Sequence, residues 1–159
     1  MSPSFGCPAY TPDGVQRITS ADGGAMMDIT VYHMRPGERR DFFQSGAEAA
    51  FLLIEGVLTL RWEGREESVS RQSCFDGGAQ ACGLHVCRGV RVSAESGAET
   101  ELFVVSTENA REFPSEFYPA ERIRSVVSCA EICGGTCERT VTTLFDNETA
   151  PLSNLVLGE

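Results

Sequence analysis

Short runs of alternating apolar and polar residues, separated by turns, recur along this chain. Residues 27–34 are one clear run, and Pro36-Gly37 ends it with a turn. Because successive side chains of a strand point to opposite faces of a sheet, each run predicts one strand. The other strands are predicted at residues 50–54, 57–62, 66–70, 84–87, 90–94, 100–107, 139–145 and 152–157. Short strands with a turn about every ten residues are typical of an all-β sandwich or barrel rather than of alternating α/β units.

The pattern divides the chain into three regions. Residues 1–24 are rich in Pro, Gly, Ser and Asp and are predicted to form an irregular N-terminal arm. Residues 25–110 carry most of the predicted strands and are expected to form a single barrel. Residues 111–159 are expected to add a short helix within residues 115–127, restricted by Pro119, and a C-terminal strand extension.

The last predicted strand, residues 152–157, ends close to the final residue, Glu159. A strand in this position leaves an open sheet edge unless it pairs with another segment. We therefore interpret the chain as one half of a longer protein, in which residues 111–159 include the start of a second barrel. The open edge also predicts a homodimer.

The charge and hydropathy of the chain argue against several classes of function. The formal net charge is −10, whereas a nucleic-acid-binding protein needs a basic face that releases counterions from the phosphates. All 13 basic residues are Arg, so chemistry through a lysine Schiff base is excluded. No apolar run approaches the roughly 20 residues of a membrane span, and the first residues lack the pattern of a signal peptide. We therefore expect a cytoplasmic protein that binds neither nucleic acid nor membrane.

The chain has seven cysteines without an export signal, which indicates reduced thiols rather than disulfides. Cys129, Cys133 and Cys137 are spaced C-x3-C-x3-C, which leaves three interpretations open: packed thiols, a metal site or a redox role. Cys87 lies two residues after His85, so a nucleophile–base pair is an alternative to simple packing. Packing is favoured in both cases, because the sequence offers no evident fourth ligand and no orienting third residue.

The segment Met34–Thr107 resembles the cupin superfamily in the order of its glycines. In PGERRDFFQSGAEAAFLLIEG, Gly37 and Gly56 occupy the flanking positions of the first cupin motif. The resemblance implies a single jelly-roll β-barrel of the cupin type. It also implies that the family's metal-binding members hold their metal with three histidines and one glutamate.

Three of these four ligands are replaced in this chain. Phe43 and Ser45 stand at the positions of the two histidines of the first motif, and Val92 stands at the position of the histidine of the second motif. Glu48 lies one residue away from the position of the glutamate. Imidazole-based metal sites need several ligands that converge on one point, so we expect no metal or other cofactor in this chain.

A closer resemblance is carried by the order of the segments LHVCRGVRVSAESGAETELFVVST, GGTCERTVTTLF and LSNLVLGE. This order is similar to the first half of the two-barrel family that contains 5-deoxy-glucuronate isomerase and 5-keto-4-deoxyuronate isomerase. Gly135, Arg139 and Val141 match the linker of that family, and Gly158-Glu159 matches the strand end before its metal-binding segment. The resemblance implies a metal-free N-terminal half of a sugar-acid isomerase from inositol or uronate catabolism, with the divalent metal in the second barrel.

Two functions therefore stay open. The chain is either the scaffold half of such an isomerase, without catalytic activity of its own, or a stand-alone, non-enzymatic cupin that binds a small ligand or a partner subunit. His33 shares its predicted face with Ile29 and Val31, so we expect it to face the interior. The candidate residues for contacts with a sugar acid or another small molecule are His33, Glu48, His85, Arg35, Arg61 and Arg91. For each arginine, solvent-exposed surface is the alternative.

Overall fold

The computed structural model describes residues 8–75, 81–129, 134 and 136–159. Helical structure in these residues is short and of the 3-10 type, and it includes η1 (Ala21–Gly23) and η2 (Ala120–Arg122). The strands are β1 (Val15–Thr19), β2 (Asp28–Met34), β3 (Arg39–Phe43), β4 (Ala47–Trp62), β5 (Arg65–Arg71), β6 (Gly83–Val86), β7 (Arg91–Ser96), β8 (Thr100–Glu108), β9 (Glu116–Tyr118), β10 (Arg124–Ser128), β11 (Arg139–Phe145) and β12 (Leu157–Gly158). None of the helical turns described has the length and hydropathy needed to cross a membrane.

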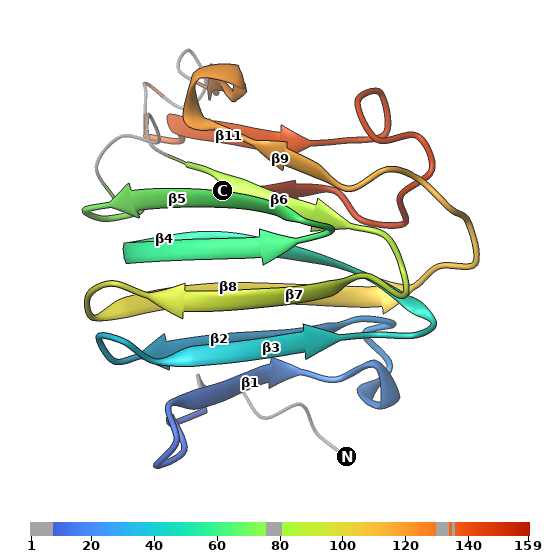
Figure 1. Ribbon diagram of the computed structural model, residues 1–159. Coiled ribbons are helices and arrows are strands. Elements are labelled where there is room, and N and C mark those ends of the chain that lie inside the picture. The colour runs from blue at the N-terminus through green and yellow to red at the C-terminus, as the bar shows by residue number, and fades with distance from the viewer. Residues whose placement is uncertain (1–7, 76–80, 130–133, 135) are drawn as a thin grey trace.

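The strands β1 to β9 form two antiparallel sheets that share β4 (Figure 1). The order is β1-β2-β8-β4-β6-β9 in the first sheet and β3-β7-β4-β5 in the second. The first half of β4 pairs with β8 and β6, and the half that starts at Gly56 pairs with β5 and β7. Antiparallel sheets stacked and connected in this way form a jelly roll, so the expected all-β, cupin-type fold is confirmed.

The strand β4 passes from one sheet to the other at Gly56. The φ of Gly56 is 106°, a conformation that other residues rarely adopt. A Cβ atom at this position would lie 2.4 Å from the carbonyl oxygen of Glu99 and 2.5 Å from Oγ1 of Thr100. A glycine is therefore required here, and the interruption that the sequence predicted after Ile54 is a bend within one long strand.

Both faces of the first sheet are buried in apolar cores. The inner core lies between the two sheets and consists of Met34, Ala49, Phe51, Leu53, Leu58, Leu60, Trp62, Cys82, Leu84, Val86, Val92, Ala94, Leu102 and Val104. The outer core lies on the opposite face of the first sheet and consists of Ala50, Leu52, Ala81, Val105, Tyr118, Leu144, Phe145, Leu155 and Leu157. Successive residues of β4 alternate between the two cores, which explains the continuous apolar run from Ala49 to Ile54.

A three-stranded sheet, β10-β11-β12, supplies the C-terminal side of the outer core. In Figure 1 its orange and red strands lie beside β6 and β9. The strand β12 pairs with β11, and the carboxylate of Glu159 binds the buried guanidinium of Arg71 at the end of β5. The predicted C-terminal strand extension is therefore packed on the jelly roll.

Several predicted elements differ from the structure. The strand β1 lies within residues 1–24, which were expected to be irregular, and it pairs with β2 at the edge of the first sheet. The helix expected within residues 115–127 is reduced to η2, with β9 and β10 on either side. Pro119 cannot continue a helix from the preceding residues, and the β-branched side chains of Val126 and Val127 suit a strand.

The strand predicted at residues 152–157 is mostly a loop, and only β12 at its end pairs with β11. Polar groups of Ser153 and Asn154 in this loop hydrogen-bond to a side chain of β4 instead of to a neighbouring strand. The alternation of leucines with polar residues in this segment therefore reflects burial of a loop rather than a strand.

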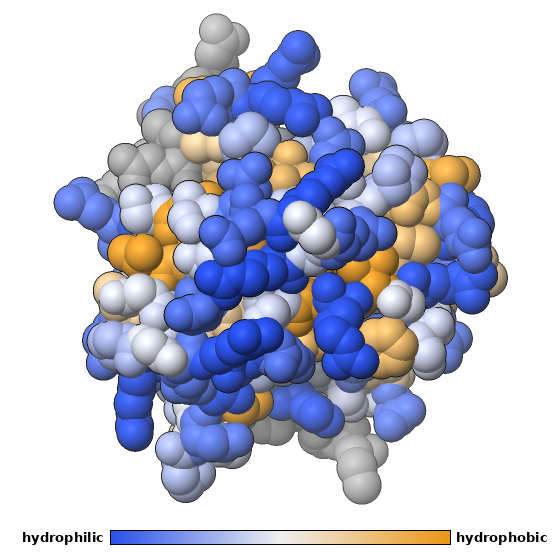
Figure 2. Space-filling view, in the orientation of Figure 1, coloured by the Kyte–Doolittle hydropathy of each residue, from blue (hydrophilic) through white to orange (hydrophobic). Residues whose placement is uncertain are grey.

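The outer face of the second sheet is mainly polar. Figure 2, in the orientation of Figure 1, shows this face covered largely by hydrophilic side chains. Ion pairs lie across it, such as those that Arg61 makes with Glu66 and Glu95. A buried polar cluster around Glu48 and His85 lies on the other face of the first sheet, beside the outer core.

Candidate functional site

The positions of the cupin metal ligands hold side chains that do not fit a metal. Val92 is fully buried in the inner core, between Phe42 and Trp62 of the neighbouring strands. Phe43 points to the outside and is half-exposed, and Ser45 is exposed. Across the described part of the chain, no three His, Cys, Asp or Glu side chains come close enough together to hold a metal ion. The residues present therefore do not match the divalent metal that the family resemblance implies for the intact protein.

A buried polar pair lies on the other face of the first sheet. Glu48 of β4 and His85 of β6 are 0% and 2% exposed, and Nε2 of His85 lies 2.7 Å from Oε2 of Glu48. The pairing of β4 with β6, in which Ala50 stands opposite His85, brings the two side chains within reach. The structure thus unites two of the candidate residues from separate segments of the chain.

Three more donors complete the surroundings of the Glu48 carboxylate. Oε1 accepts hydrogen bonds from Nδ2 of Asn109 (3.0 Å) and from the backbone N–H of Asn154 (2.6 Å). Oε2 accepts a hydrogen bond from the hydroxyl of Ser153 (2.8 Å) in addition to the bond from His85. Four donors therefore compensate a carboxylate that is sealed from solvent, which makes its burial tolerable.

These contacts decide the charge of Glu48. Burial raises the pKa of its carboxyl, but the hydrogen bonds from His85, Asn154 and Ser153 outweigh burial and hold the pKa below the usual value. Glu48 is therefore ionised at neutral pH. An ionised carboxylate can only accept hydrogen bonds, so the hydrogen between the two residues is carried by Nε2 of His85. In the neutral imidazole, the lone pair then lies on Nδ1.

Two aromatic rings hold the imidazole of His85 in place. The ring of Phe145 is stacked at 4.3 Å with an interplanar angle of 12°, and the ring of Phe113 is stacked at 4.7 Å with an angle of 30°. These contacts cover both faces of the imidazole, so only its edge is left for other groups.

A cavity of about 220 Å³ adjoins this imidazole. We call it the His85 cavity; its lining consists of His85, Phe113, Pro114, Glu116, Tyr118 and residues 149–153. Most of these side chains are aromatic or apolar, and a few polar groups lie among them. That combination is typical of small-molecule sites, although drug-sized ligands usually need a cavity of at least about 300 Å³.

His33 and Arg35 lie together in a different place. Both line a hollow of about 550 Å³ between β2 and residues 10–14. Acidic and basic side chains are mixed in this hollow, and they include Glu38 and Arg40. An ion pair joins these two residues at 2.6 Å, so the hollow has no strong bias toward one charge.

The prediction that His33 faces the interior is wrong. Tyr32 and Met34 are the residues of β2 that pack in the inner core, whereas His33 points outward and is 44% exposed. Its Nε2 lies 3.0 Å from a carboxylate oxygen of Glu99. The prediction failed because both faces of β2 carry apolar residues; Ile29, on the same face as His33, packs at the outer core.

Arg61 and Arg91 form the third pair of candidates. Both line an open hollow on the outer face of the second sheet. Arg61 is bound by Glu66 (2.5 Å) and Glu95 (2.6 Å), and the guanidinium of Arg91 lies 5.0 Å from the ring centre of Phe43. The six candidates therefore fall into three separate pairs, and only the pair of Glu48 and His85 is buried.

Two of the thiols, those of Cys82 and Cys87, are buried. Burial raises the pKa of Cys82 to about 11, which keeps it protonated at neutral pH. The thiol of Cys87 donates to the backbone oxygen of Arg111 at 3.6 Å. Cys129 and Cys137 follow β10 and precede β11, and Cys133 of the predicted cluster lies outside the described residues.

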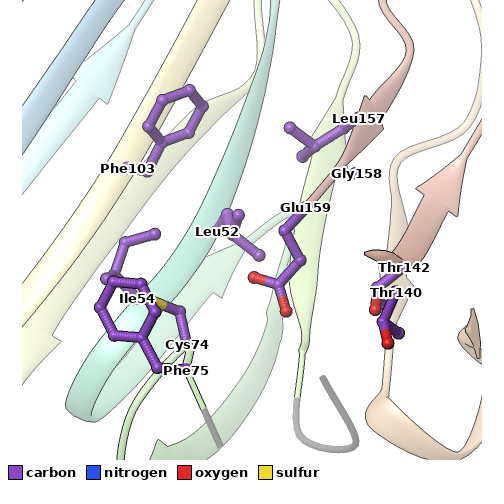
Figure 3. A pocket seen from close by; sticks show the side chains of 10 residues that line it. All are labelled: Leu52, Ile54, Cys74, Phe75, Phe103, Thr140, Thr142, Leu157, Gly158 and Glu159. Carbon is purple, nitrogen blue, oxygen red and sulfur yellow. The ribbon is translucent and has the colours of Figure 1, made fainter. Parts of the chain in front are cut away.

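A larger hollow of about 580 Å³ lies between the first sheet and the strands β11 and β12. Figure 3 shows that apolar side chains such as Leu52, Phe103 and Leu157 line it, and that the carboxylate of Glu159 lies between Leu52 and Thr142. None of the six candidate residues lines this hollow.

Sequence reasoning did not identify the partners of Glu48 and His85. Asn109 and Ser153 lie 61 and 105 residues from Glu48, and no local pattern indicates such distant contacts. The one available signal is that Ser153 and Asn154 interrupt an otherwise apolar segment. Polar residues at buried positions need hydrogen-bond partners, and this requirement predicts a partner without identifying it.

Comparison with solved structures finds proteins of similar fold. An IolB-like protein from Salmonella typhimurium LT2 superimposes with a TM-score of 0.78 at 16% identity, covering 90% of this chain and 53% of that protein. Protein YlbA from E. coli superimposes with a TM-score of 0.62 at 13% identity, covering 92% of this chain and 57% of YlbA. At these identities the likeness shows a shared fold. The chain spans little more than half the length of either protein.

Among curated proteins, none matches this chain in sequence. The sequence profile of the KduI/IolB family, however, matches residues 9–159, which is nearly the whole chain. The family that the segments LHVCRGVRVSAESGAETELFVVST and LSNLVLGE predicted is thereby confirmed. This chain belongs to the KduI/IolB family.

Proposed function

We propose that this chain is the N-terminal half of a sugar-acid isomerase of the 5-deoxy-glucuronate type, and that it does not catalyse the reaction by itself. The observation that carries the proposal is a family match over residues 9–159 in a chain whose inner core holds Val92 at the position of a metal-binding histidine. The relative lengths of the solved structures support a second half that completes the enzyme.

The proposed division of labour follows from the chemistry. Interconversion of an aldose acid and a ketose acid moves a proton between carbons next to a carbonyl group, and a divalent metal stabilises the negative charge that develops. The inner core is packed with apolar side chains, and among the described residues no three His, Cys, Asp or Glu side chains gather there for this role. In the proposal, this half supplies a scaffold and the other half supplies the chemistry.

An assay of the isolated chain tests the proposal. The purified chain is treated with a chelator, reloaded with Mn²⁺ or Zn²⁺, and assayed for turnover of 5-deoxy-glucuronate. We expect no turnover above the rate without protein, and less than roughly a tenth of an equivalent of bound transition metal by elemental mass spectrometry. A two-barrel member of the family in the same assay is the positive control. Turnover at an enzyme-like rate by this chain alone would contradict the proposal.

A second function, binding of a small ligand by a non-enzymatic cupin, is favoured by the His85 cavity. The coding sequence beyond Glu159 discriminates between the two functions. Continuation into a His-x-His segment supports the isomerase, whereas a stop codon supports the stand-alone module. The homodimer and the cytoplasmic location stay predictions, which sedimentation and cell fractionation test.

A further inference from the structure

We propose that the His85 cavity binds a small neutral aromatic alcohol of the phenol class, whose hydroxyl donates a hydrogen bond to Nδ1 of His85. The proposal is carried by a buried histidine that a carboxylate orients and that adjoins an apolar cavity. It uses neither a metal nor a sugar acid, so it stands or falls independently of the isomerase proposal.

The orientation of His85 determines what a ligand must offer. Nε2 donates to the ionised Glu48 at 2.7 Å, and in the tautomer of His85 that carries one ring hydrogen, on Nε2, the other nitrogen, Nδ1, is a hydrogen-bond acceptor. Both hydrogen bonds of the His85 ring to the described residues involve Nε2, and none involves Nδ1. Nδ1 is not among the fully buried polar atoms that lack a partner, which is consistent with an atom that reaches the cavity. An accessible acceptor beside a cavity favours a ligand that carries a hydrogen-bond donor.

The walls of the cavity determine the body of the ligand. Phe113, Tyr118, Pro151 and Leu152 present aromatic and apolar surface, which favours an apolar ring. An engineered apolar cavity of about 150 Å³ in another protein binds benzene. The His85 cavity, at about 220 Å³, therefore has room for one six-membered ring with a small substituent.

The charges around the cavity determine the ionisation state of the ligand. The carboxylate of Glu48 lies behind the imidazole, and Glu116 lines the cavity while its carboxylate binds Arg122 at 2.7 Å. Tyr118 reports on this environment directly, because its own side chain is a phenol. Burial, followed by the charge of Glu116, raises the pKa of Tyr118 to about 12. A phenol bound nearby is likewise held in its neutral form, and an anionic ligand is disfavoured.

Nuclear magnetic resonance of the histidine side chains tests the proposal. The chain has only two histidines, so its imidazole Cε1–Hε1 spectrum contains two signals. His33→Gln assigns them, and His33 in the unaltered chain is an internal control because it lies in a different hollow. On titration with phenol we expect a saturable shift of the His85 signal, with a dissociation constant between roughly 0.1 and 10 mM. The His33 signal is expected to stay in place.

Two further probes separate the hydrogen bond from simple apolar binding. Anisole has the same ring but no hydroxyl donor, and we expect it to bind at least roughly tenfold more weakly than phenol. Benzoate carries a negative charge, and we expect no saturable shift of the His85 signal. Equal binding of phenol and anisole, or a stronger response to benzoate, would overturn the proposal.

A variant that fills the cavity completes the test. Ala150 lines the cavity and is half-buried, so Ala150→Leu places additional methyl groups in the proposed binding site. We expect this variant to lose the phenol-dependent shift while its His33 signal is unchanged. Binding as strong as in the unaltered chain, or no saturable His85 shift in the unaltered chain, would overturn the proposal. The comparison of phenol with anisole needs no variant, so the outcome does not depend on the folding of Ala150→Leu.

Discussion

Both faces of the first half of β4 are buried, yet the inner face is entirely apolar and the outer face carries a charge. Ala49, Phe51 and Leu53 pack in the inner core, whereas Glu48 binds His85 and Ser153 on the outer face. Apolar packing is non-directional, while the carboxylate needs donors at defined distances and angles. The buried hydrogen bonds that require a defined geometry therefore lie where the C-terminal segment packs on the first sheet, and the contacts between the two sheets are mainly apolar.

The position of Glu48 explains why its carboxylate belongs to the outer face. In the sequence, Glu48 lies one residue away from the glutamate position of the first cupin motif. Side chains of a strand alternate between faces, so a displacement by one residue turns a side chain from one face to the other. The neighbouring Ala49 points into the inner core instead. The side chain of Glu48 therefore takes part in the hydrogen-bond network of the outer face.

Removal of the buried charge is expected to have the largest effect. Glu48→Ala leaves His85, Asn109, Ser153 and the backbone N–H of Asn154 without their acceptor. Each buried donor left without an acceptor typically costs about 1–3 kcal/mol, so we expect the free energy of unfolding to fall by at least about 3 kcal/mol. Urea unfolding measures it. A loss below about 1 kcal/mol is typical of solvent-exposed pairs, and it would contradict the importance that we assign to the buried network around Glu48.

A histidine introduced on the inner face tests the other side of the comparison. Val92→His restores one residue of the missing motif, but its imidazole would be buried between Phe42 and Trp62. We expect the free energy of unfolding to fall by about 1–3 kcal/mol, because the larger polar ring disrupts the packing and finds no partner. Thermal unfolding with and without Zn²⁺ gives the second readout. A melting temperature that rises with Zn²⁺ would contradict our interpretation that the described residues of the inner core do not form a metal site.

The sequence predicted the fold more successfully than the site, and the difference has a physical basis. Alternation and turn residues are local, and they located β2, β5, β8 and β11. The strand β3 was not predicted because charged and aromatic residues follow one another in RRDFF without a regular apolar period. Residues 124–128 form a strand that pairs with β11, and the β-branched Val126 and Val127 alone did not distinguish this strand from a short helix.

The candidate site depends on contacts between distant segments. Glu48 and His85 were both named from the sequence, but as separate candidates, since their contact depends on the register of β4 against β6. The orientation of His33 was predicted wrongly, because alternation defines two faces without saying which of them is inside. Residues in the loop before β9, such as Phe113, carried no signal at all.

Acid is expected to weaken the outer face selectively. Burial raises the pKa of Glu48 and its hydrogen bonds lower it, and the result lies below the ordinary value of 4.5. The unfolded chain therefore takes up this proton first as the pH falls. The stabilisation from Glu48 is complete above pH 4.5 and is lost as the pH falls through the pKa of the folded state. We expect the difference in unfolding free energy between the unaltered chain and Glu48→Ala to be constant near neutral pH and to shrink in acid. A difference that grows on acidification would reverse the sign of the proposed linkage.

The smallest effect is expected at the second pair of a glutamate and a histidine in this molecule. Glu99 and His33 lie 3.0 Å apart, close to the separation in the buried pair, but their side chains are 64% and 44% exposed. Water solvates both groups before and after the substitution, so we expect Glu99→Ala to change the free energy of unfolding by no more than about 0.5 kcal/mol. The same urea experiment measures it beside Glu48→Ala. Equal losses in the two variants would mean that the contact itself, rather than its burial under the C-terminal segment, determines the energy of the pair. A much larger loss in Glu48→Ala than in Glu99→Ala would mean that the energy comes from the buried donors that lose their acceptor on the outer face of β4.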